Sequence, residues 1–457
     1  MKTIFRILSL VLIITVLSGC VLACDSGDDE GRRKNSNSDS NNSESVAGGS
    51  DSESESSQNG ESESSSSNKK PSTNNKNPSR IMVSDLKNYK FVVSANASDT
   101  LKATAKHVCE VAGKTWESDA VLKTDDYATA SQEKYEILIG ETNRTESIKH
   151  KAKTKVGEGG YALEGTKLTI LGYSESETIA ALQMFLVDYV MGTPSSSIFF
   201  TDSYNFQTDL SDYVSIMSFN VYVYIESDAE KKANVIKFIR AYSPDVFGVQ
   251  EASAKWQVTL KDEFSKDYHI VGTGRDGNGN GEASLIFAKK SKFNIKSSGT
   301  KWLSSTPDRV SKVAEAALNR IVTYAVIERI SDGKIFNYAN THLDHVGGQE
   351  EQVGYLCQII DNNMQKGAPT FVTGDFNMTP DVDAFAKMKS LGYTPSSDLA
   401  TKNDSKGIGT MHSSSGVIDY LFVRNGMNVE TYLYRICNED YYGKGSDHHP
   451  IFNIVKF

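Results

Sequence analysis

The chain has 457 residues, too many for one ordinary domain, and its 38% hydrophobic and 23% charged residues lie below the fractions usual for a compact protein. A net charge of −9 disfavours a basic protein that coats nucleic acid, five cysteines exclude a disulfide-built scaffold, and nine prolines exclude a collagen-like fibre. A low apolar fraction without a high charge fraction indicates that a polar segment dilutes ordinary globular domains.

Residues 1–19 have the order of charge and hydrophobicity of a secretory signal peptide. Two basic residues among the first six precede the apolar run Ile7–Leu17, which is too short for a comfortable membrane span. The run ends in Leu17-Ser18-Gly19-Cys20, which resembles a bacterial lipoprotein signal cleaved before Cys20 and lipidated on its thiol. We therefore expect an extracytoplasmic protein that is lipid-anchored to the bacterial cell membrane through Cys20. The alternative is an ordinary signal peptide with an incidental cysteine, and Cys24, in Val21-Leu22-Ala23-Cys24, is a weaker second candidate for lipidation.

Residues 20–80 are predicted to form a disordered tether rich in Ser, Asn and Glu. Between Asp25 and Ser79 the only apolar side chains beyond glycine and proline are Val46 and Ala47. Such a segment cannot bury enough surface to offset chain entropy. A flexible coil of this length reaches on the order of 40 Å, which suits a spacer with no specific partner.

Residues 81–210 regain a globular composition and alternate predicted strands and helices. We expect strands at 91–95 and 135–140, a hairpin at 161–171, and helices at 100–113 and 178–191. The stretches YEILIGETNR and ETIAALQMFLVDYV resemble the small α+β accessory domain found ahead of some glycoside hydrolases. The resemblance implies a non-catalytic module that contacts glycan or cell wall. Glu141, Asn143 and Arg144 are a ligand-site candidate there, although a polar loop after a strand is the interpretation that we favour.

Residues 213–457 are predicted to be a single α/β domain in which polar residues follow the ends of strands. The expected strands are 214–221, 245–250, 284–288, 321–329, 334–340, 370–373, 417–423 and 451–455, and the expected helices are 229–241 and 350–364. Loops at strand ends are where α/β proteins build their sites.

The polar residues beyond these strands form a hard, oxygen-rich set without cysteine. They are Asn220, Glu251, His342, Asp375, Asn377, Asp419, Asp447 and His448. The set does not fit a structural zinc site, whereas Mg²⁺ needs only one or two carboxylates and completes its shell with waters and phosphate oxygens. The remaining acids and imidazoles are then available for proton transfer, which is the inventory for hydrolysing a phosphate ester.

Six segments in order resemble the endonuclease/exonuclease/phosphatase superfamily. The segments are SIMSFNV, VFGVQEA, NTHLDHVG, FVTGDFN, VIDYLFV and GSDHHP. One such motif would be weak, but six in the family's order are specific. The superfamily includes deoxyribonuclease I-like nucleases, abasic-site endonucleases, inositol polyphosphate 5-phosphatases and bacterial sphingomyelinases. The resemblance implies a four-layered α/β sandwich of two packed, mostly antiparallel sheets with helices outside.

The resemblance also implies a division of labour among the polar residues. Glu251 is similar to the main metal-ligand glutamate, helped by Asn220 and Asp447, and the implied ion is Mg²⁺ with Mn²⁺ as a substitute. Many nucleases of the family carry an acid where this chain has Tyr222, which puts a second metal position in doubt.

The catalytic roles are implied in the same way. Asp375 and Asn377 resemble the pair that orients the attacking water and contacts the phosphate. His448 resembles the catalytic imidazole and Asp419 the carboxylate that orients it, while His342 resembles the second histidine, which binds a phosphoryl oxygen or helps the leaving group. Water would attack in line, without a covalent enzyme intermediate.

A closer resemblance is to an uncharacterised bacterial branch of the superfamily. It rests on KWLSSTP at 301–307, RIVTYA at 320–325 and GTMH at 409–412. Arg320 is our candidate for a contact to the substrate phosphate, and a strand-edge arginine is the alternative. Glu282 and His345 are further candidates for substrate binding.

Two functions compete with a phosphoesterase at this point, and the identity of its substrate stays open. THLDH at 341–345 is similar to part of the metallo-β-lactamase zinc motif but lacks its first histidine pair, and a non-catalytic, glycan-binding surface lipoprotein is the rival from another class. From residue 213 onward, 27 basic and 28 acidic residues nearly balance, which weakly favours a small phosphoester, a sugar phosphate or a lipid head group over DNA. An extracellular deoxyribonuclease therefore stays an alternative, and we expect a monomer.

Overall fold

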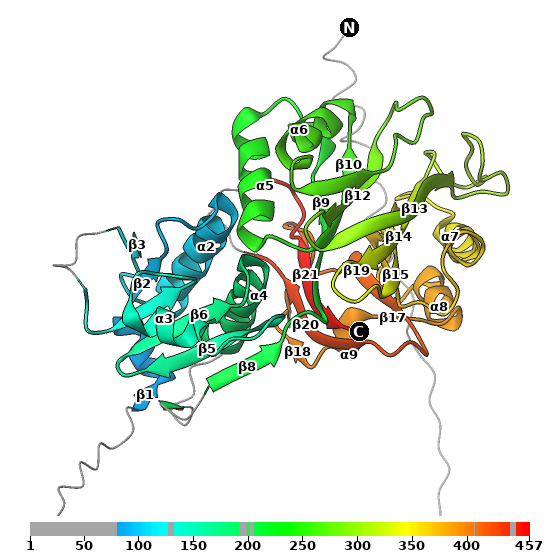
Figure 1. Ribbon diagram of the computed structural model, residues 1–457. Helices are drawn as coiled ribbons and strands as arrows, with labels where there is room; N and C mark the ends of the chain where they lie inside the picture. The colour runs from blue at the N-terminus through cyan, green and yellow to red at the C-terminus, as the bar shows by residue number, and fades with distance from the viewer. Residues whose placement is uncertain (1–79, 127–131, 192–198, 202–204, 406, 439–444) are drawn as a thin grey trace, which may run out of the picture. The chain divides into compact units, whose positions relative to one another are not determined.

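The computed structural model describes residues 80–126, 132–191, 199–201, 205–405, 407–438 and 445–457 (Figure 1). The predicted signal peptide, Cys20 and the predicted tether lie outside the described residues. Within these ranges, no helix combines the length and the apolar character needed to cross a membrane.

Residues 80–209 form a mixed sheet with helices packed on it, in the strand order β3-β2-β4-β6-β5-β8. Its strands are β2 (Lys90–Val93), β3 (Leu122–Thr124), β4 (Glu136–Ile139), β5 (Glu158–Glu164), β6 (Lys167–Gly172) and β8 (Asn205–Asp209), while β1 (Arg80–Met82) and β7 (Phe199–Thr201) form a separate pair. The helical segments are η1 (Val83–Asn88), α2 (Asp99–Thr115), α3 (Thr145–Lys151), α4 (Glu175–Phe185) and the π-helical turn η3 (Leu186–Val190). The helix predicted at 178–191 thus changes its winding after Phe185.

A seven-stranded sheet and a six-stranded sheet make up most of residues 213–457. The first, in the order β11-β12-β10-β9-β21-β20-β18, contains β9 (Tyr213–Asn220), β10 (Val246–Ala252), β11 (Tyr268–Val271), β12 (Ala283–Lys289), β18 (Lys402–Asn403), β20 (Glu430–Ile436) and β21 (Ile451–Lys456). The second, in the order β13-β14-β15-β16-β19-β17, contains β13 (Phe293–Trp302), β14 (Ile321–Arg329), β15 (Ile335–His342), β16 (Thr370–Asp375), β17 (Tyr393–Pro395) and β19 (Asp419–Arg424). The pairs β9–β10, β15–β16 and β18–β20 are parallel, and the others are antiparallel.

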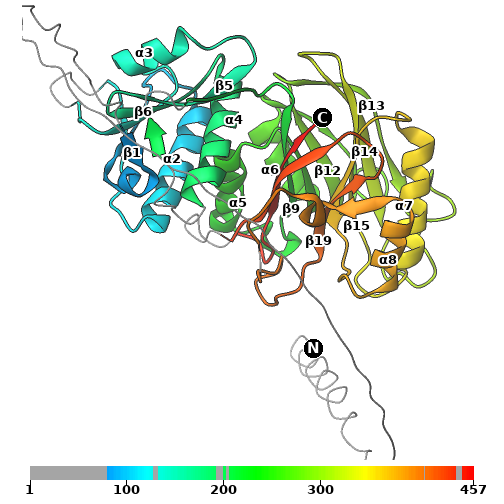
Figure 2. The same ribbon diagram turned by 90° about the horizontal axis from the view of Figure 1, so that it is seen from below.

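The two sheets pack face to face and carry helices on their outer faces. The inner core joins apolar side chains of both sheets, such as Ile216 and Ile286 of one and Phe336 and Phe371 of the other. Figures 1 and 2 show the outer helices, with one pair beside each sheet. They are α5 (Ala229–Tyr242) and α6 (Ala254–Phe264) on the seven-stranded sheet, and α7 (Gln349–Asn363) and α8 (Asp383–Ser390) on the six-stranded sheet. The predicted four-layered α/β sandwich is confirmed.

The outer helices have identifiable starts and stops. The Asp228 side chain accepts a hydrogen bond from the Lys231 N–H at the start of α5, and Ser253 does the same for Trp256 at the start of α6. Helix α5 ends at Ser243, which adopts the left-handed conformation with φ 46°. These caps determine where each helix begins and ends, and therefore which residues of the following strands lie at the edge of the sheet.

The described residues from Arg80 onward belong to one compact unit. Its two parts are joined by the Gln183 side chain, whose Nε2 donates to the Tyr242 carbonyl at 2.7 Å, and by Asp188, whose Oδ1 accepts from the Tyr432 hydroxyl at 2.8 Å. The division at 81–210 and 213–457 stays a prediction.

Candidate active site

Strand pairing brings the predicted residues to one edge of the two packed sheets. Asn220 and His342 end β9 and β15, and Asp375 ends β16. In the six-stranded sheet, His342 is the register partner of Asp375, and Asp375 is the partner of Asp419, which begins β19. Residues far apart in sequence therefore meet because strand ends and strand starts alternate along this edge.

Asn220 links the two sheets at the centre of the site. Its amide Nδ2 donates to Glu251 Oε1 and to Asp375 Oδ2, both at 3.0 Å, while its Oδ1 accepts from the Tyr222 N–H at 3.0 Å. Asn220 is fully buried. In this arrangement it holds two carboxylates in place as a donor, and its carbonyl oxygen is occupied by the backbone.

Two site residues have a strained backbone. Glu251 has φ 58° and Asn377 has φ 47°, in the left-handed region that residues other than glycine rarely adopt. The Ser253 N–H donates to the Glu251 carbonyl at 2.9 Å, and the Asn377 N–H donates to Asp375 Oδ1 at 3.0 Å. Strain of this kind persists where surrounding contacts fix it, and it is concentrated at functional sites.

His448 is a buried, charged imidazole. Its Nδ1 lies 2.8 Å from Asp419 Oδ2, and its Nε2 lies 3.8 Å from Asp375 Oδ2. Burial alone would lower the pKa of His448, but the Asp419 carboxylate outweighs it and raises the pKa to about 10. The imidazole is therefore protonated at neutral pH.

His342 is the opposite case. Its Nε2 lies 3.1 Å from Asn377 Nδ2 and 3.5 Å from Asp375 Oδ2. Burial, followed by the positive charge of Arg320, lowers the pKa of His342 well below its usual value. A neutral Nε2 that accepts from the Asn377 amide fits this contact.

Asp375 stands between the two imidazoles and is itself buried. Burial, together with the neighbouring Asp419 carboxylate, raises the pKa of Asp375 to about 7. It is thus a carboxyl group that can exchange a proton near neutral pH, which is the property of a general acid or base.

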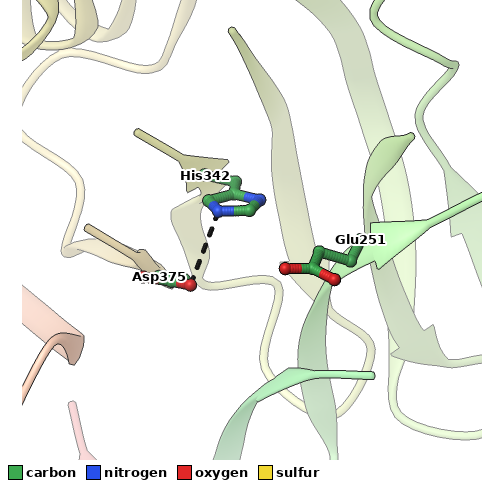
Figure 3. Close-up of side chains that lie close together, drawn as sticks. All are labelled: Glu251, His342 and Asp375. Carbon is green, nitrogen blue, oxygen red and sulfur yellow. Dashed lines mark ion pairs between the residues drawn. The ribbon is translucent and has the colours of Figure 1, made fainter. Parts of the chain in front are cut away.

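The donors at this edge fit a divalent cation. Glu251, His342 and Asp375 each offer a ligand atom within 4.8 Å of the others, and Figure 3 shows the Glu251 carboxylate pointing toward the other two side chains. Burial raises the pKa of Asp447, and the charge of Glu251 adds to this effect. A cation among these crowded acids would relieve their repulsion, and hard oxygen ligands suit Mg²⁺. A second group, Asp375, Asp419 and His448, is less suited because the Asp419–His448 hydrogen bond occupies two of its ligand atoms.

Of the three predicted substrate-binding residues, Arg320 and His345 contact each other, whereas Glu282 contacts Arg275. Arg320 precedes β14, and its Nη2 lies 3.3 Å from His345 Nδ1. Glu282 precedes β12 and accepts two hydrogen bonds from Arg275, at 2.8 and 2.9 Å. Burial raises the pKa of Glu282, and the Arg275 charge opposes this.

The sequence analysis did not single out Arg275 or Asp344. Asp344 is fully buried and accepts from Arg320 Nε at 3.3 Å and from the backbone N–H of Leu318 at 2.9 Å. A signal for Asp344 was present, since it lies within the motif NTHLDHVG. Arg275 lies in the glycine-rich segment GRDGNGNGE, where only the structure reveals its partner.

Comparisons with known proteins agree with this architecture. An endonuclease/exonuclease/phosphatase from Bacteroides vulgatus is 27% identical over 54% of this chain and 99% of its own, with a TM-score of 0.50. A family protein from Bacteroides thetaiotaomicron is 24% identical over 54% of this chain and 98% of its own, with a TM-score of 0.49. A mannosyl-6-phosphatase from the same species is 25% identical over 53% and 100%, with a TM-score of 0.48. None of the curated proteins is significantly similar to the chain.

A four-layered sandwich with these acids and imidazoles at one sheet edge defines a class of hydrolase folds. The model of the endonuclease/exonuclease/phosphatase family matches residues 217–448, and the chain belongs to that family.

Proposed function

We propose that the protein is a Mg²⁺-dependent hydrolase of phosphate esters, displayed on the bacterial cell surface by a lipid anchor. The observation that supports the chemistry most is the position of Asp375. This buried carboxylate accepts from Asn220 and Asn377 and lies 3.5 and 3.8 Å from the two imidazoles.

The metal ligands in this proposal are Glu251 and Asp447. Asp375, which offers a ligand atom within 4.8 Å of that of Glu251, is kept for proton transfer, and Asn220 holds the carboxylates of Glu251 and Asp375 in place. A divalent cation bound there would polarise a phosphoryl oxygen and lower the pKa of a bound water. Mn²⁺ would substitute for Mg²⁺, because it also accepts octahedral oxygen ligands.

Asp375 acts as the base. With a pKa of about 7, it can take a proton from water as the water oxygen forms its bond to phosphorus. The bond from phosphorus to the leaving oxygen breaks on the opposite side, so that no covalent enzyme intermediate forms. Asn377, which is hydrogen-bonded to His342 and to the Leu343 carbonyl, has a fixed side chain that can orient the phosphoryl group.

His448 supplies positive charge in this mechanism. Its Nδ1–H is held by Asp419, so the protonated Nε2 can donate to a phosphoryl oxygen as negative charge develops there. Neutral His342 is suited to a hydrogen bond with a phosphoryl oxygen or with the leaving group.

A phosphoester panel tests the function. The panel contains mono- and bis-nitrophenyl phosphate, single- and double-stranded DNA, sphingomyelin and inositol phosphates, each with Mg²⁺ and with EDTA. We expect Mg²⁺-dependent turnover that falls by about 10³-fold or more in Asp375→Asn and in His448→Ala while the proteins stay folded. Asp398→Asn, on an exposed carboxylate of α9 (Ser396–Leu399), is the matched control and should keep full activity. Undiminished turnover in either site variant would overturn the assignment.

The same panel separates the alternatives. A deoxyribonuclease would favour the DNA substrates, whereas a glycan-binding lipoprotein without enzymatic activity would turn over none of them. The near balance of charge from residue 213 onward supports a small substrate over DNA.

The surface location rests on the sequence at Leu17–Cys20. Cys20→Ser should release the protein from membranes into the medium or the soluble fraction and abolish incorporation of a labelled fatty acid. Cys24→Ser is the matched control and should leave both unchanged. Membrane retention of the Cys20 variant would overturn this part of the proposal.

A further inference from the structure

The Arg320 guanidinium, beside the candidate active site, has one buried hydrogen-bond donor without an acceptor. Its side chain is 3% exposed; Nε donates to Asp344 and Nη2 contacts His345. Its Nη1 is buried and has no hydrogen-bond partner among the described residues. A buried donor of a charged group that lacks an acceptor destabilises the protein, so an acceptor from a ligand would be strongly favoured here.

A second guanidinium, that of Arg275, lies near Arg320 and adds to the positive charge there. Arg275 is buried, and both of its terminal nitrogens are bound by Glu282. After burial, the Arg275 charge lowers the pKa of Arg320 most, and the carboxylates of Asp344 and Glu282 oppose it, which indicates that the two guanidinium groups lie near each other. An anion between them would relieve the repulsion.

The two arginines lie on the His342 side of the reacting centre. Both of their charges act on the His342 imidazole, which contacts Asn377 and Asp375. Glu251 of the candidate cation site is linked to Asp375 through Asn220, whose Nδ2 donates to both carboxylates at 3.0 Å. A phosphoryl group held at Asp375 would therefore have the cation site on one side and Arg320 on another.

The arginines come from two segments that contact each other. Asn319 Nδ2 donates to Asp276 Oδ1 at 3.1 Å, and a side-chain carbon placed on Gly277 would come within 2.9 Å of Val310. The hairpin at 272–283 and the segment 303–320 thus meet where Arg275 and Arg320 project. The unpaired Arg320 donor can therefore meet a terminal oxygen of a phosphate bound beside His342.

We infer that Arg320, supported by Arg275, binds the third non-ester oxygen of a terminal phosphate and so selects phosphomonoesters over phosphodiesters. A monoester phosphate has three non-ester oxygens and up to two negative charges, whereas a diester has two such oxygens and one charge. The cation site and His448 serve two oxygens, and the Arg320 Nη1 serves the third. This inference rests on the proposed phosphoesterase activity and narrows its substrate class.

The test compares Arg320→Lys with the native protein on nitrophenyl phosphate and bis-nitrophenyl phosphate. Lysine keeps the charge but cannot contact Asp344 and a ligand with separate nitrogens. We expect kcat/KM for the monoester to fall about 100-fold and that for the diester less than about 5-fold, so that the ratio of the two collapses. Arg309→Lys changes an exposed arginine of the same segment and should leave the ratio unchanged.

A binding measurement gives a readout that does not depend on turnover. Inorganic phosphate, titrated calorimetrically into the native protein in the presence of Mg²⁺, should bind at least 10-fold more tightly than to Arg320→Lys, with folding checked by circular dichroism. Arg275→Lys, at the less buried of the two guanidinium groups, is the second variant if Arg320→Lys does not fold, and should change both measurements in the same direction.

The possible outcomes distinguish the selection of monoesters from the phosphoesterase activity itself. Equal losses for both esters, or unchanged phosphate binding, would overturn the selection of monoesters while leaving the phosphoesterase intact. A native protein that prefers the diester would also overturn it. If the native protein turns over no phosphoester with Mg²⁺ or Mn²⁺, the proposed function fails, and the phosphate titration still decides whether Arg320 binds a terminal phosphate.

Discussion

His342 and His448 are the same residue type with opposite charge states. The Asp419 carboxylate is hydrogen-bonded to His448 Nδ1 and, against the effect of burial, raises the pKa of that imidazole to about 10. Burial and the guanidinium of Arg320 lower the pKa of His342. One imidazole is therefore suited to stabilise developing negative charge, and the other is a neutral hydrogen-bonding group.

Asp419→Asn should expose this difference. The amide still accepts from Nδ1 but carries no charge, so the pKa of His448 falls and the imidazolium is lost at a lower pH. We expect kcat at neutral pH to drop about 10²–10⁴-fold and the alkaline limb of the pH–rate profile to move to lower pH. A profile that overlies the native one, measured beside Asp398→Asn, would contradict the role given to Asp419.

Glu251→Gln tests the cation site directly. Glutamine is nearly the same size and can still accept from the Val223 N–H, which donates to Glu251 Oε2 at 2.8 Å, but it loses the negative charge. Isothermal titration with Mg²⁺ should show affinity reduced at least about 10-fold. Glu230→Gln, on an exposed residue of α5, should bind Mg²⁺ like the native protein, and equal affinity in both variants would place the cation elsewhere.

Most of the candidate site could be predicted because its residues follow recognisable strands in family motifs. The hydrogen bonds of Asn220 to Glu251 and Asp375 could not, since they join residues that are 31 and 155 positions away along the chain. The pair Arg275–Glu282 was missed for another reason. Six residues of turn separate the two, and a glycine-rich turn carries no periodicity that would reveal its register.

At the scale of elements, buried strands were the most predictable. Strand β14 has the predicted bounds because Ile321–Ile327 is apolar except at Thr323 and the strand is buried along almost all of its length. Strand β13 was not predicted because its exposed middle, with Ser297 and Ser298, has neither an apolar run nor strict alternation. It forms because β14 supplies hydrogen-bond partners along its length, apart from one irregularity near Ile295.

A buried polar network between the sheets gives an element-scale prediction. Asn340 of β15 donates to the carbonyls of Val249 and Leu285, each at 2.9 Å, and its Oδ1 accepts from Gln250 at 2.7 Å. Asn340→Ala would leave these groups unpaired and create a cavity, at a cost of about 2–4 kcal/mol in the free energy of unfolding. Urea unfolding followed by circular dichroism measures this loss.

The control for that network is Asn294→Ala, which changes an exposed asparagine of β13. Its effect should stay within about 0.5 kcal/mol. Equal stability of the two variants would show that the Asn340 contacts contribute little to holding the sheets together.

At the scale of the whole molecule, the dilute composition of the sequence has a clear distribution. Apolar cores fill the described residues from Ile81 onward. The polar stretch 25–79 carries most of the deficit of apolar residues, and it shares the excess of acidic residues about equally with residues 80–212. The total of −9 therefore says little about the hydrolase portion, which is close to neutral.

Asp188 contributes a polar contact between the two globular parts, beside that of Gln183. It accepts from the hydroxyls of Tyr161 and Tyr432, both at 2.8 Å, and pairs with Lys402. Its side chain is 11% exposed, so its removal leaves two hydroxyls and an ammonium without their shared acceptor. We expect Asp188→Ala to lower the free energy of unfolding by about 1–3 kcal/mol, while kcat stays within about twofold because the catalytic edge is untouched.

Differential scanning calorimetry with Asp361→Ala as the control measures this effect. Asp361 pairs with Arg424 in the open, its side chain 53% exposed, and such surface pairs contribute about 0–1 kcal/mol. The native protein should unfold in one transition if the contact couples the two parts, and Asp188→Ala should broaden or split it. An Asp188→Ala thermogram that matches that of Asp361→Ala would mean that residues 80–209 and the hydrolase portion are held together by their apolar surfaces instead.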